Sequence, residues 1–404
     1  MPTPNERAQA GLFLALLCNA AGQSFLNVVL PPLGRRLGFS DLQTGLILSV
    51  SALLLMLTAA AWGYASERIG RRPVTLIALS AATMAPFAFA LTVAGNAAGA
   101  LANGLTLMLF FGIRSLQTTM SSGLLPAAQA YVADTTTIDK RAGGMGVIGA
   151  AYGFGAVAGA ALAWLVAGTS VPAAFGMLGC AAGAALLCVI RVLPEPGGGT
   201  RDGRRAQGAP RLGRIWPFLA VTLTAMIAYS IVQHVTALRL QDALGFSSEH
   251  AIARAGAAFM VTAAMMGVVQ AVALRYLAWK PERLLTSGAV LAATALFLCS
   301  VARDYVEIVA TLALFGAALG FMLPGNLASL SLRAAERAQG KVAGVNVIAQ
   351  GCGLAIGPVA GASLHQIAHA LPFVAAAALM VCCTFFAAAG RMQGRTDGPA
   401  AHAG

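Results

Sequence analysis

Apolar stretches of about 20 residues recur along the chain, with short polar segments between them. A helix of about 20 apolar residues crosses the hydrocarbon core of a bilayer, and the period-two alternation of a membrane β-barrel is absent. The pattern therefore predicts an all-α membrane protein with twelve transmembrane helices. The first stretch is too long for a signal-peptide core, and Pro31 and Pro32 are expected to end it. The predicted spans are 9–33, 42–65, 73–94, 98–122, 143–167, 172–193, 215–238, 254–279, 283–302, 305–330, 339–363 and 371–390.

The longest polar segment, residues 194–214, divides the twelve spans into two groups of six. Glycine, proline and arginine dominate it, which is typical of a flexible linker. The flanking halves, 1–193 and 215–404, also resemble each other, because a shift of 198 residues aligns nine identities within residues 125–163. The sequence therefore predicts two pseudo-symmetric six-helix halves. Duplicated halves of this kind indicate alternating access, with substrate bound between them near the middle of the bilayer.

Composition and charge agree with a membrane protein. The chain is 58% hydrophobic and 10% charged, whereas soluble domains carry about 25% charged residues. Of its 26 basic residues, 20 lie in segments on the predicted side of the N-terminus, 5 lie on the opposite side, and Arg114 lies within a span. This asymmetry places both termini in the cytoplasm, and we expect a bacterial inner-membrane protein. The net charge of +12 is thus explained by topology, and no nucleic-acid partner is expected.

The loop between the second and third spans carries the most specific motif. It reads Gly63-Tyr-Ala-Ser-Glu67-Arg68-Ile-Gly70-Arg71-Arg72. Gly63 permits close approach of helices, Gly70 permits a tight turn, and the charged side chains form a cluster at the membrane surface. The spacing resembles the signature G-x-x-x-[DE]-R-x-G-R-[RK] of the major facilitator superfamily. The resemblance implies that Glu67 and Arg71 belong to a latch between the halves, with Asp134 as the expected partner of the arginines.

A second motif lies in the fourth span, where Arg114 and Gln117 resemble the R-x-x-Q-G motif of the same superfamily. The chain departs from this motif at Thr118, where the family has glycine. A cation inside a bilayer costs at least about 2.5–3.5 kcal/mol, so it normally faces a central cavity. The resemblance implies a role for Arg114 in proton coupling or anion binding. The alternative is that its side chain reaches a nearby lipid headgroup.

Spaced glycines form a third motif. In the fifth span, Gly146, Gly155 and Gly159 resemble the glycine motif of drug/proton antiporters, although Ala160 replaces its proline. Such glycines permit tight packing or bending of helices. The resemblance, strengthened by a tetracycline-exporter-like segment around Asp134, implies export. The eleventh span contains a fuller match, at Gly344, Gly353, Gly357, Pro358 and Gly361.

Polar side chains inside the spans are the candidate substrate site. Asn19, Gln23 and Asn27 form one stripe on the first span, and amides of this kind are unlikely to face lipid. No acidic residue lies deep inside a predicted span, so a cavity containing Arg114 favours neutral, zwitterionic or anionic substrates. His234 is a candidate titrating partner of Arg114. Hydrogen bonding between helices is the alternative role for the amides. The further candidates are Tyr152, Tyr229, Gln233, Asn346 and Gln350.

These features favour a secondary-active, proton-coupled exporter of a small polar organic molecule, such as a drug, siderophore or metabolite. The cavity without acidic residues favours a dedicated exporter over a polyspecific drug pump. The alternatives are proton-coupled uptake of a sugar or organic acid and, more remotely, a membrane enzyme. The sequence contains no phosphate-binding loop, and its seven cysteines lack metal-ligand spacing. We therefore expect a monomer without enzymatic activity, metal or cofactor, energised by the proton gradient.

Overall fold

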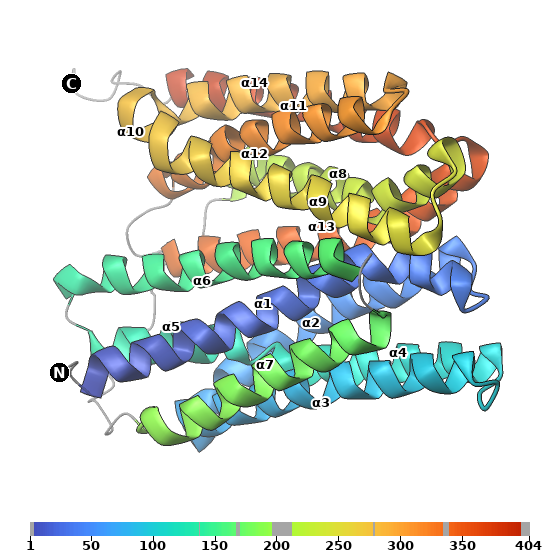
Figure 1. Cartoon of the computed structure of the whole chain (residues 1–404). Coiled ribbons are helices and arrows are strands. Elements are labelled where there is room, and N and C mark those ends of the chain that lie inside the picture. The colour runs from blue at the N-terminus through green and yellow to red at the C-terminus, as the bar shows by residue number, and fades with distance from the viewer. Residues whose placement is uncertain are drawn as a thin grey trace, which may run out of the picture. The chain divides into compact units, whose positions relative to one another are not determined.

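The structure is a computed structural model that describes residues 4–136, 138–166, 170–195, 212–277, 279–333 and 339–396. Within these ranges the regular structure is helical throughout (Figure 1). Residues 196–211 of the predicted linker lie outside the described ranges. The elements are α1 (Pro4–Arg36), α2 (Asp41–Ile69), α3 (Arg71–Ala97), α4 (Asn103–Ser121), α5 (Leu124–Thr135), α6 (Ile138–Leu165), α7 (Val171–Val192), α8 (Leu212–Leu244), α9 (Ser248–Val268), the π-helical η2 (Val269–Ala273), α10 (Leu274–Leu277), α11 (Pro281–Val301), α12 (Tyr305–Arg333), α13 (Gln339–Ile367) and α14 (Leu371–Thr396).

Eleven of the described helices are long and apolar enough to cross a membrane. The predicted fourth span differs from them, because α4 has 19 residues and contains Arg114, Gln117 and several hydroxyl side chains. After a break at Ser122 and Gly123 the chain continues as α5. The predicted all-α class with twelve membrane helices is confirmed, with α4 as the polar exception.

Helix α1 continues past the two residues that were expected to end it. Pro31 and Pro32 lie inside α1, which runs on to Arg36. Membrane helices tolerate proline where neighbouring elements satisfy the freed backbone groups. Leu30 and Leu33, on either side of the two prolines, are buried. The expected stop is therefore wrong, because burial of this segment outweighs the loss of two backbone donors.

The described residues form two compact units. One unit comprises residues 1–202 and 236–260, and the other comprises 203–235 and 261–404. Helices α8 and α9 therefore contribute to both units. The division into halves at the linker, expected from the sequence repeat, stays a prediction.

In the first unit, two glycines of α6 lie against the backbone of α1. A Cβ atom at Gly155 would lie 2.5 Å from the carbonyl oxygen of Leu17, and one at Gly159 would overlap the carbonyl oxygen of Ala21. Neither oxygen can rotate away, since both belong to a helix backbone. Gly146 differs, because it is exposed and a Cβ there would meet nothing within 4 Å. The predicted packing role thus finds a geometric basis at Gly155 and Gly159 and none at Gly146.

The second unit repeats this contact between α13 and α8. A Cβ atom at Gly353 would lie 2.7 Å from the carbonyl oxygen of Leu223, and one at Gly357 would lie 2.9 Å from that of Ile227. Gly344 is exposed and has open space, as Gly146 does. The sequence repeat therefore corresponds to the same helix contact in each unit.

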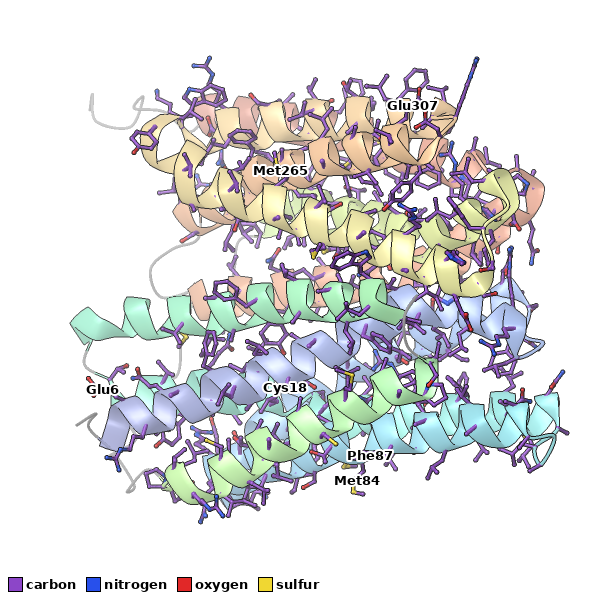
Figure 2. The ribbon with its side chains drawn as sticks, viewed as in Figure 1. Glu6, Cys18, Met84, Phe87, Met265 and Glu307 are labelled. Atoms are coloured by element: carbon purple, nitrogen blue, oxygen red, sulfur yellow. The ribbon has the colours of Figure 1, made fainter. Side chains whose placement is uncertain are left out.

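The outer surfaces of the helices carry large apolar side chains. Met84 on α3 and Met265 on α9 are both exposed, and Met84 points away from the neighbouring helices (Figure 2). Exposed apolar side chains of this size on long apolar helices are typical of a surface that faces lipid.

Candidate functional site

Arg114 lies on the buried face of α4. Phe110, Arg114 and Gln117 follow one another at helical spacing and are all buried. The ring of Phe110 packs 4.9 Å from that of Phe89, which in turn lies 5.4 Å from Phe175. This row of aromatic rings from α3, α4 and α7 sets the rotation of α4. With only 6% of its surface exposed, Arg114 points into the protein, which argues against contact with a lipid headgroup.

The guanidinium of Arg114 has unused hydrogen-bonding capacity. Its Nη1 donates to Oε1 of Gln117 at 3.1 Å, while its Nε has no hydrogen-bond partner. The buried hydroxyl of Thr118, one residue beyond Gln117, also has none. No carboxylate of the described residues forms an ion pair with Arg114. Leaving a buried charge without a counter-charge is costly, so this part of α4 is suited to receive an anionic or strongly dipolar group.

The polar stripe of α1 is partly engaged in contacts between helices. Asn19 is buried and hydrogen-bonds the hydroxyl of Tyr152 on α6. Further along α1, the hydroxyl of Ser24 donates to the carbonyl oxygen of Ala156 at 2.8 Å. The structure thus supports the alternative, interhelical role for Asn19. Gln23 and Asn27 are half-buried on the same helix, and their role in binding stays a prediction.

In the second unit, Asn346 belongs to a buried network that joins α8, α12 and α13. Its Oδ1 lies 2.7 Å from the hydroxyl of Thr222, and Nδ2 of Asn326 donates to the same hydroxyl at 2.8 Å. Asn326 also donates to the carbonyl oxygen of Phe218 at 3.1 Å. Thr222 and Asn326 were not among the residues predicted from the sequence. Asn326 could have been found from the sequence, because it is an amide in an otherwise apolar stretch, directly after Pro324-Gly325.

The other predicted residues of this unit differ in exposure. His234 is buried at 1% exposure, whereas Gln350 is exposed. Nε2 of Gln233 lies 3.5 Å from the hydroxyl of Tyr229, both half-buried on α8. The structure thus distributes the predicted residues over two groups, one in each unit. Their joint participation in a transport pathway stays a prediction.

The motif between α2 and α3 forms a charged cluster within the first unit. Nε of Arg71 lies 3.1 Å from Oδ2 of Asp134, the partner expected from the sequence. Nη1 of Arg71 donates to the hydroxyl of Ser66 at 2.7 Å. Arg68 contacts Tyr64 on α2. The close helix approach expected at Gly63 is absent, since a Cβ there would lie 3.8 Å from Pro126, an ordinary contact.

Glu195, which was not among the predicted site residues, caps the first turn of α3. Its carboxylate accepts hydrogen bonds from the backbone N–H groups of Arg71 at 2.7 Å and Arg72 at 3.1 Å. A carboxylate satisfies the free donors of a helix N-terminus and interacts favourably with the helix dipole. Gly70 permits this contact through its φ of 100°, and a Cβ there would lie 2.5 Å from the carboxylate. The sequence feature that could have indicated Glu195 is its place between two prolines at the start of the predicted linker.

We expect Gly70→Ala to lower the free energy of unfolding by about 1–3 kcal/mol, because the alanine is strained at positive φ and displaces Glu195. Gly63→Ala, in the same motif, is the matched control. It meets only an ordinary contact, and we expect it to be neutral or stabilising by up to about 1 kcal/mol. Thermal unfolding of the purified variants measures both. Equal unfolding temperatures would contradict the role assigned to Gly70.

A second charged cluster lies at the C-terminal end of α1. Arg35 makes two hydrogen bonds to Asp41, both at 2.7 Å, and two to Asp242 at 2.6 and 2.8 Å. The neighbouring Arg36 pairs with Glu249 at 2.8 Å, with about half of each side chain exposed. These pairs lie within the first unit and join α1 and α2 to the ends of α8 and α9. Residues on both sides of the predicted linker therefore contribute to this unit.

We expect Asp242→Asn to lower the free energy of unfolding by about 1–2 kcal/mol, because Arg35 then loses one of two charged partners in a partly buried site. Glu249→Gln removes an exposed pair and should cost less than about 0.5 kcal/mol. Thermal unfolding at low and high salt distinguishes the effects of the two variants. A larger loss for Glu249→Gln would show that the Arg35 pair contributes little.

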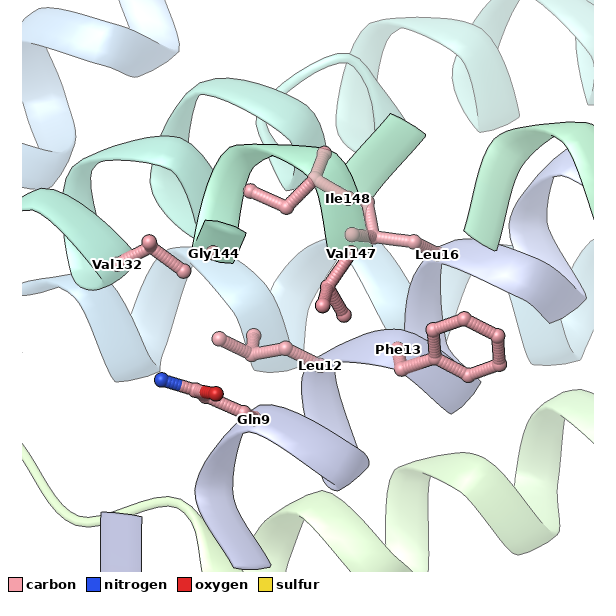
Figure 3. A pocket seen from close by; sticks show the side chains of 8 residues that line it. All are labelled: Gln9, Leu12, Phe13, Leu16, Val132, Gly144, Val147 and Ile148. Carbon is pink, nitrogen blue, oxygen red and sulfur yellow. The ribbon is translucent and has the colours of Figure 1, made fainter. Parts of the chain in front are cut away.

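A cleft between α1, α5 and α6 is too small to hold an organic substrate. Its volume is about 10 Å³, which is roughly the room that one water molecule needs. The amide of Gln9 stands at its edge, and the other side chains are apolar (Figure 3). The lining residues are Gln9, Leu12, Phe13, Leu16, Val132, Gly144, Val147 and Ile148.

Together, the repeated helix contacts, the exposed apolar surface of long apolar helices and the buried Arg114, which has no described counter-charge, are typical of a polytopic helical transporter with an internal repeat. The family described as Major Facilitator Superfamily matches residues 12–358, so the chain belongs to this superfamily of transporters, which are not enzymes. It is a secondary transporter homologous to multidrug and tetracycline efflux proteins.

Three relatives illustrate this homology. Multidrug resistance protein 2 of Bacillus subtilis (strain 168) is 22% identical over 390 residues, covering 92% of this chain and 93% of the relative. Multidrug resistance protein 1 of the same organism is 24% identical, covering 90% of each chain. Tetracycline resistance protein, class D, of Salmonella ordonez is 34% identical over 164 residues, covering 40% of this chain and 38% of the relative.

Solved structures confirm the fold. The human organic anion transporter MFSD10 (TETRAN) superimposes with a TM-score of 0.70 at 20% identity, covering 96% of this chain and 100% of that structure. A D-xylose-proton symporter superimposes with a TM-score of 0.74 at 14% identity, covering 94% and 96%. At these identities the likeness concerns the fold alone.

Proposed function

We propose that this chain exports a small polar organic molecule in exchange for protons by alternating access, with both termini in the cytoplasm. The observation that carries this proposal is Arg114, a buried cation of α4 with an unused donor and no carboxylate partner among the described residues. A membrane protein retains such a costly group where a substrate or a coupling step uses it. The relatives, which match this chain over most or part of its length, are named as drug resistance proteins, and these names support export as the direction of transport.

The charge of Arg114 also narrows the substrate class. The described helices place no carboxylate beside it, so a lipophilic cation would meet repulsion at this point. A neutral, zwitterionic or anionic molecule would instead receive hydrogen bonds from the guanidinium. Tetracycline-like zwitterions fit this class. The relatives named above are multidrug and tetracycline resistance proteins, so the proposed substrate class does not include siderophores.

Transport into everted membrane vesicles tests the proposal. On energisation, vesicles containing the protein should accumulate tetracycline or an anionic dye more than vesicles without it, and a protonophore should abolish the difference. Ethidium, a lipophilic cation, serves as the contrasting substrate and should be transported poorly. Accumulation that survives the protonophore, or a preference for ethidium, would contradict the proposal.

Uptake of a sugar or organic acid by the same fold is the second candidate. The fold shared with the D-xylose-proton symporter permits uptake, and the direction of accumulation decides between uptake and export. Uptake predicts accumulation in right-side-out vesicles and none in everted ones.

A further inference from the structure

An open groove runs along α11 in the second unit, and none of its lining residues belongs to the amide network of Thr222, Asn326 and Asn346. Its volume is about 630 Å³. Arg283, Ser287, Val290 and Thr294 lie along it at helical spacing, and Phe321 of α12 forms part of its wall. From Arg283 to Thr294 the helix rises about 16 Å, which is close to one leaflet of a hydrocarbon core about 30 Å thick. The groove therefore has the length of one lipid acyl chain.

One end of this groove is cationic and aromatic. The rings of Trp279 and Phe321 stack with centroids 6.2 Å apart, and the guanidinium of Arg283 lies 4.3 Å from the centroid of Trp279. Lys280 and Arg283 are exposed, and neither forms an ion pair with another described residue. Trp279 and the two cations match the composition of a membrane–water interface.

The carboxylate that lies between these two cations in the sequence, Glu282, is paired with a different cation. Oε1 of Glu282 is paired with Arg333 at 3.0 Å, and Arg333 is itself mostly buried. An anion at Lys280 and Arg283 would therefore meet two positive charges that have no described counter-ion. By the distribution of basic residues, this end of α11 is the predicted cytoplasmic end, where anionic lipids give the leaflet a negative surface potential.

The remainder of the groove is suited to a hydrocarbon chain. Val290 is 53% exposed and Leu291 half-exposed, and both are large apolar side chains. Ser287 and Thr294 also line the groove, and their side chains are small, so they leave it open. An apolar groove with a cationic aromatic end has the amphipathic pattern of a phospholipid.

We propose that this groove binds one anionic glycerophospholipid of the cytoplasmic leaflet, with its phosphate on Arg283 and Lys280 and an acyl chain along Ser287, Val290 and Thr294. Bound there, the lipid stabilises the packing of α11 against α12, because it favours the folded state by mass action. This inference is independent of the transported substrate.

Native mass spectrometry of the full-length protein tests the inference, with phosphatidylglycerol and phosphatidylcholine of identical acyl chains as probes. We expect selective retention of phosphatidylglycerol. One surface cation near an anionic lipid contributes about fivefold in affinity, so Lys280→Gln with Arg283→Gln should reduce retention about 25-fold. Arg303→Gln, an exposed cation at the other end of α11, is the matched control and should retain the lipid fully.

A third variant tests the acyl-chain part of the groove. Ser287→Trp fills it while leaving both cations in place, so it should weaken retention of either lipid. Unfolding temperatures without added lipid, equal to that of the unsubstituted protein, show that the variants are folded. Equal retention of the two lipids, unchanged retention in the double variant, or displacement of the lipid by tetracycline would overturn the inference. So would a second copy of the chain bound at this face in place of the lipid.

Discussion

Gly159→Ala is expected to lower the unfolding temperature of the protein strongly, because the new methyl group would overlap the carbonyl oxygen of Ala21. It would also lie 2.9 Å from the backbone nitrogen of Phe25. Overpacking a well-packed core costs about 1–3 kcal/mol, and the upper end applies where the obstacle is backbone that cannot change rotamer. Helices α1 and α6 would have to separate along their contact. We therefore also expect loss of transport.

Gly153→Ala is the matched control for this prediction. Gly153 lies on the same helix, is exposed, and a Cβ there would meet nothing within 4 Å. Alanine is a better helix former, so this variant should be neutral or stabilising by up to about 1 kcal/mol. The same contrast applies to Gly357→Ala and Gly344→Ala in the second unit. Thermal unfolding in one detergent compares all four, and similar behaviour within a pair would refute the packing role.

Arg114→Gln is expected to reduce proton-driven export about 10- to 100-fold while leaving the protein folded. A charged hydrogen bond contributes about 1.5–3 kcal/mol, which corresponds to this range in affinity. Stability should stay equal or rise, because the substitution removes a buried charge that has no described counter-charge. This combination of lost transport and retained stability separates a functional residue from a structural one. Initial rates in everted vesicles and unfolding temperatures measure the two effects.

Two further variants help to interpret the effect of Arg114→Gln on export. Arg191→Gln removes an exposed cation of α7 and should leave export unchanged. His234→Gln tests the predicted titrating partner, and we expect export to lose its dependence on the proton gradient. Unaltered coupling in both Arg114→Gln and His234→Gln would exclude the proposed coupling role of these residues.

Much of the architecture follows from properties that are local in sequence. Span length and apolar composition predict the helices, because lipid leaves the backbone no other partners than those within a helix. The spacing of Gly155 and Gly159, and of their counterparts Gly353 and Gly357, indicates close packing in both halves. The resemblance of the motif around Gly70 and Arg71 to the superfamily signature implied the ion pair with Asp134, in which Nε of Arg71 lies 3.1 Å from Oδ2 of Asp134.

Other features depend on contacts that no local pattern encodes. Glu195 caps α3 across more than 120 residues of sequence, and Asn326 meets Thr222 across 104. Gly146 belongs to the same sequence motif as Gly155 and yet faces open space. A motif records spacing along a helix, whereas the rotation of that helix and its neighbours decide which glycine is in contact.

The sequence by itself determined that this chain is a helical membrane protein with an internal repeat, because the bilayer imposes one length and one polarity on every span. It also predicted that Arg114 lies inside a membrane span. Only the tertiary structure decided that Arg114 is buried on the Phe110 face of α4 with an unused donor, and that Asn19 and Asn346 are engaged in hydrogen bonds with other helices. The reason is that hydrogen-bond satisfaction depends on which side chains neighbouring helices bring within about 3 Å, and sequence spacing within one helix does not define its neighbours.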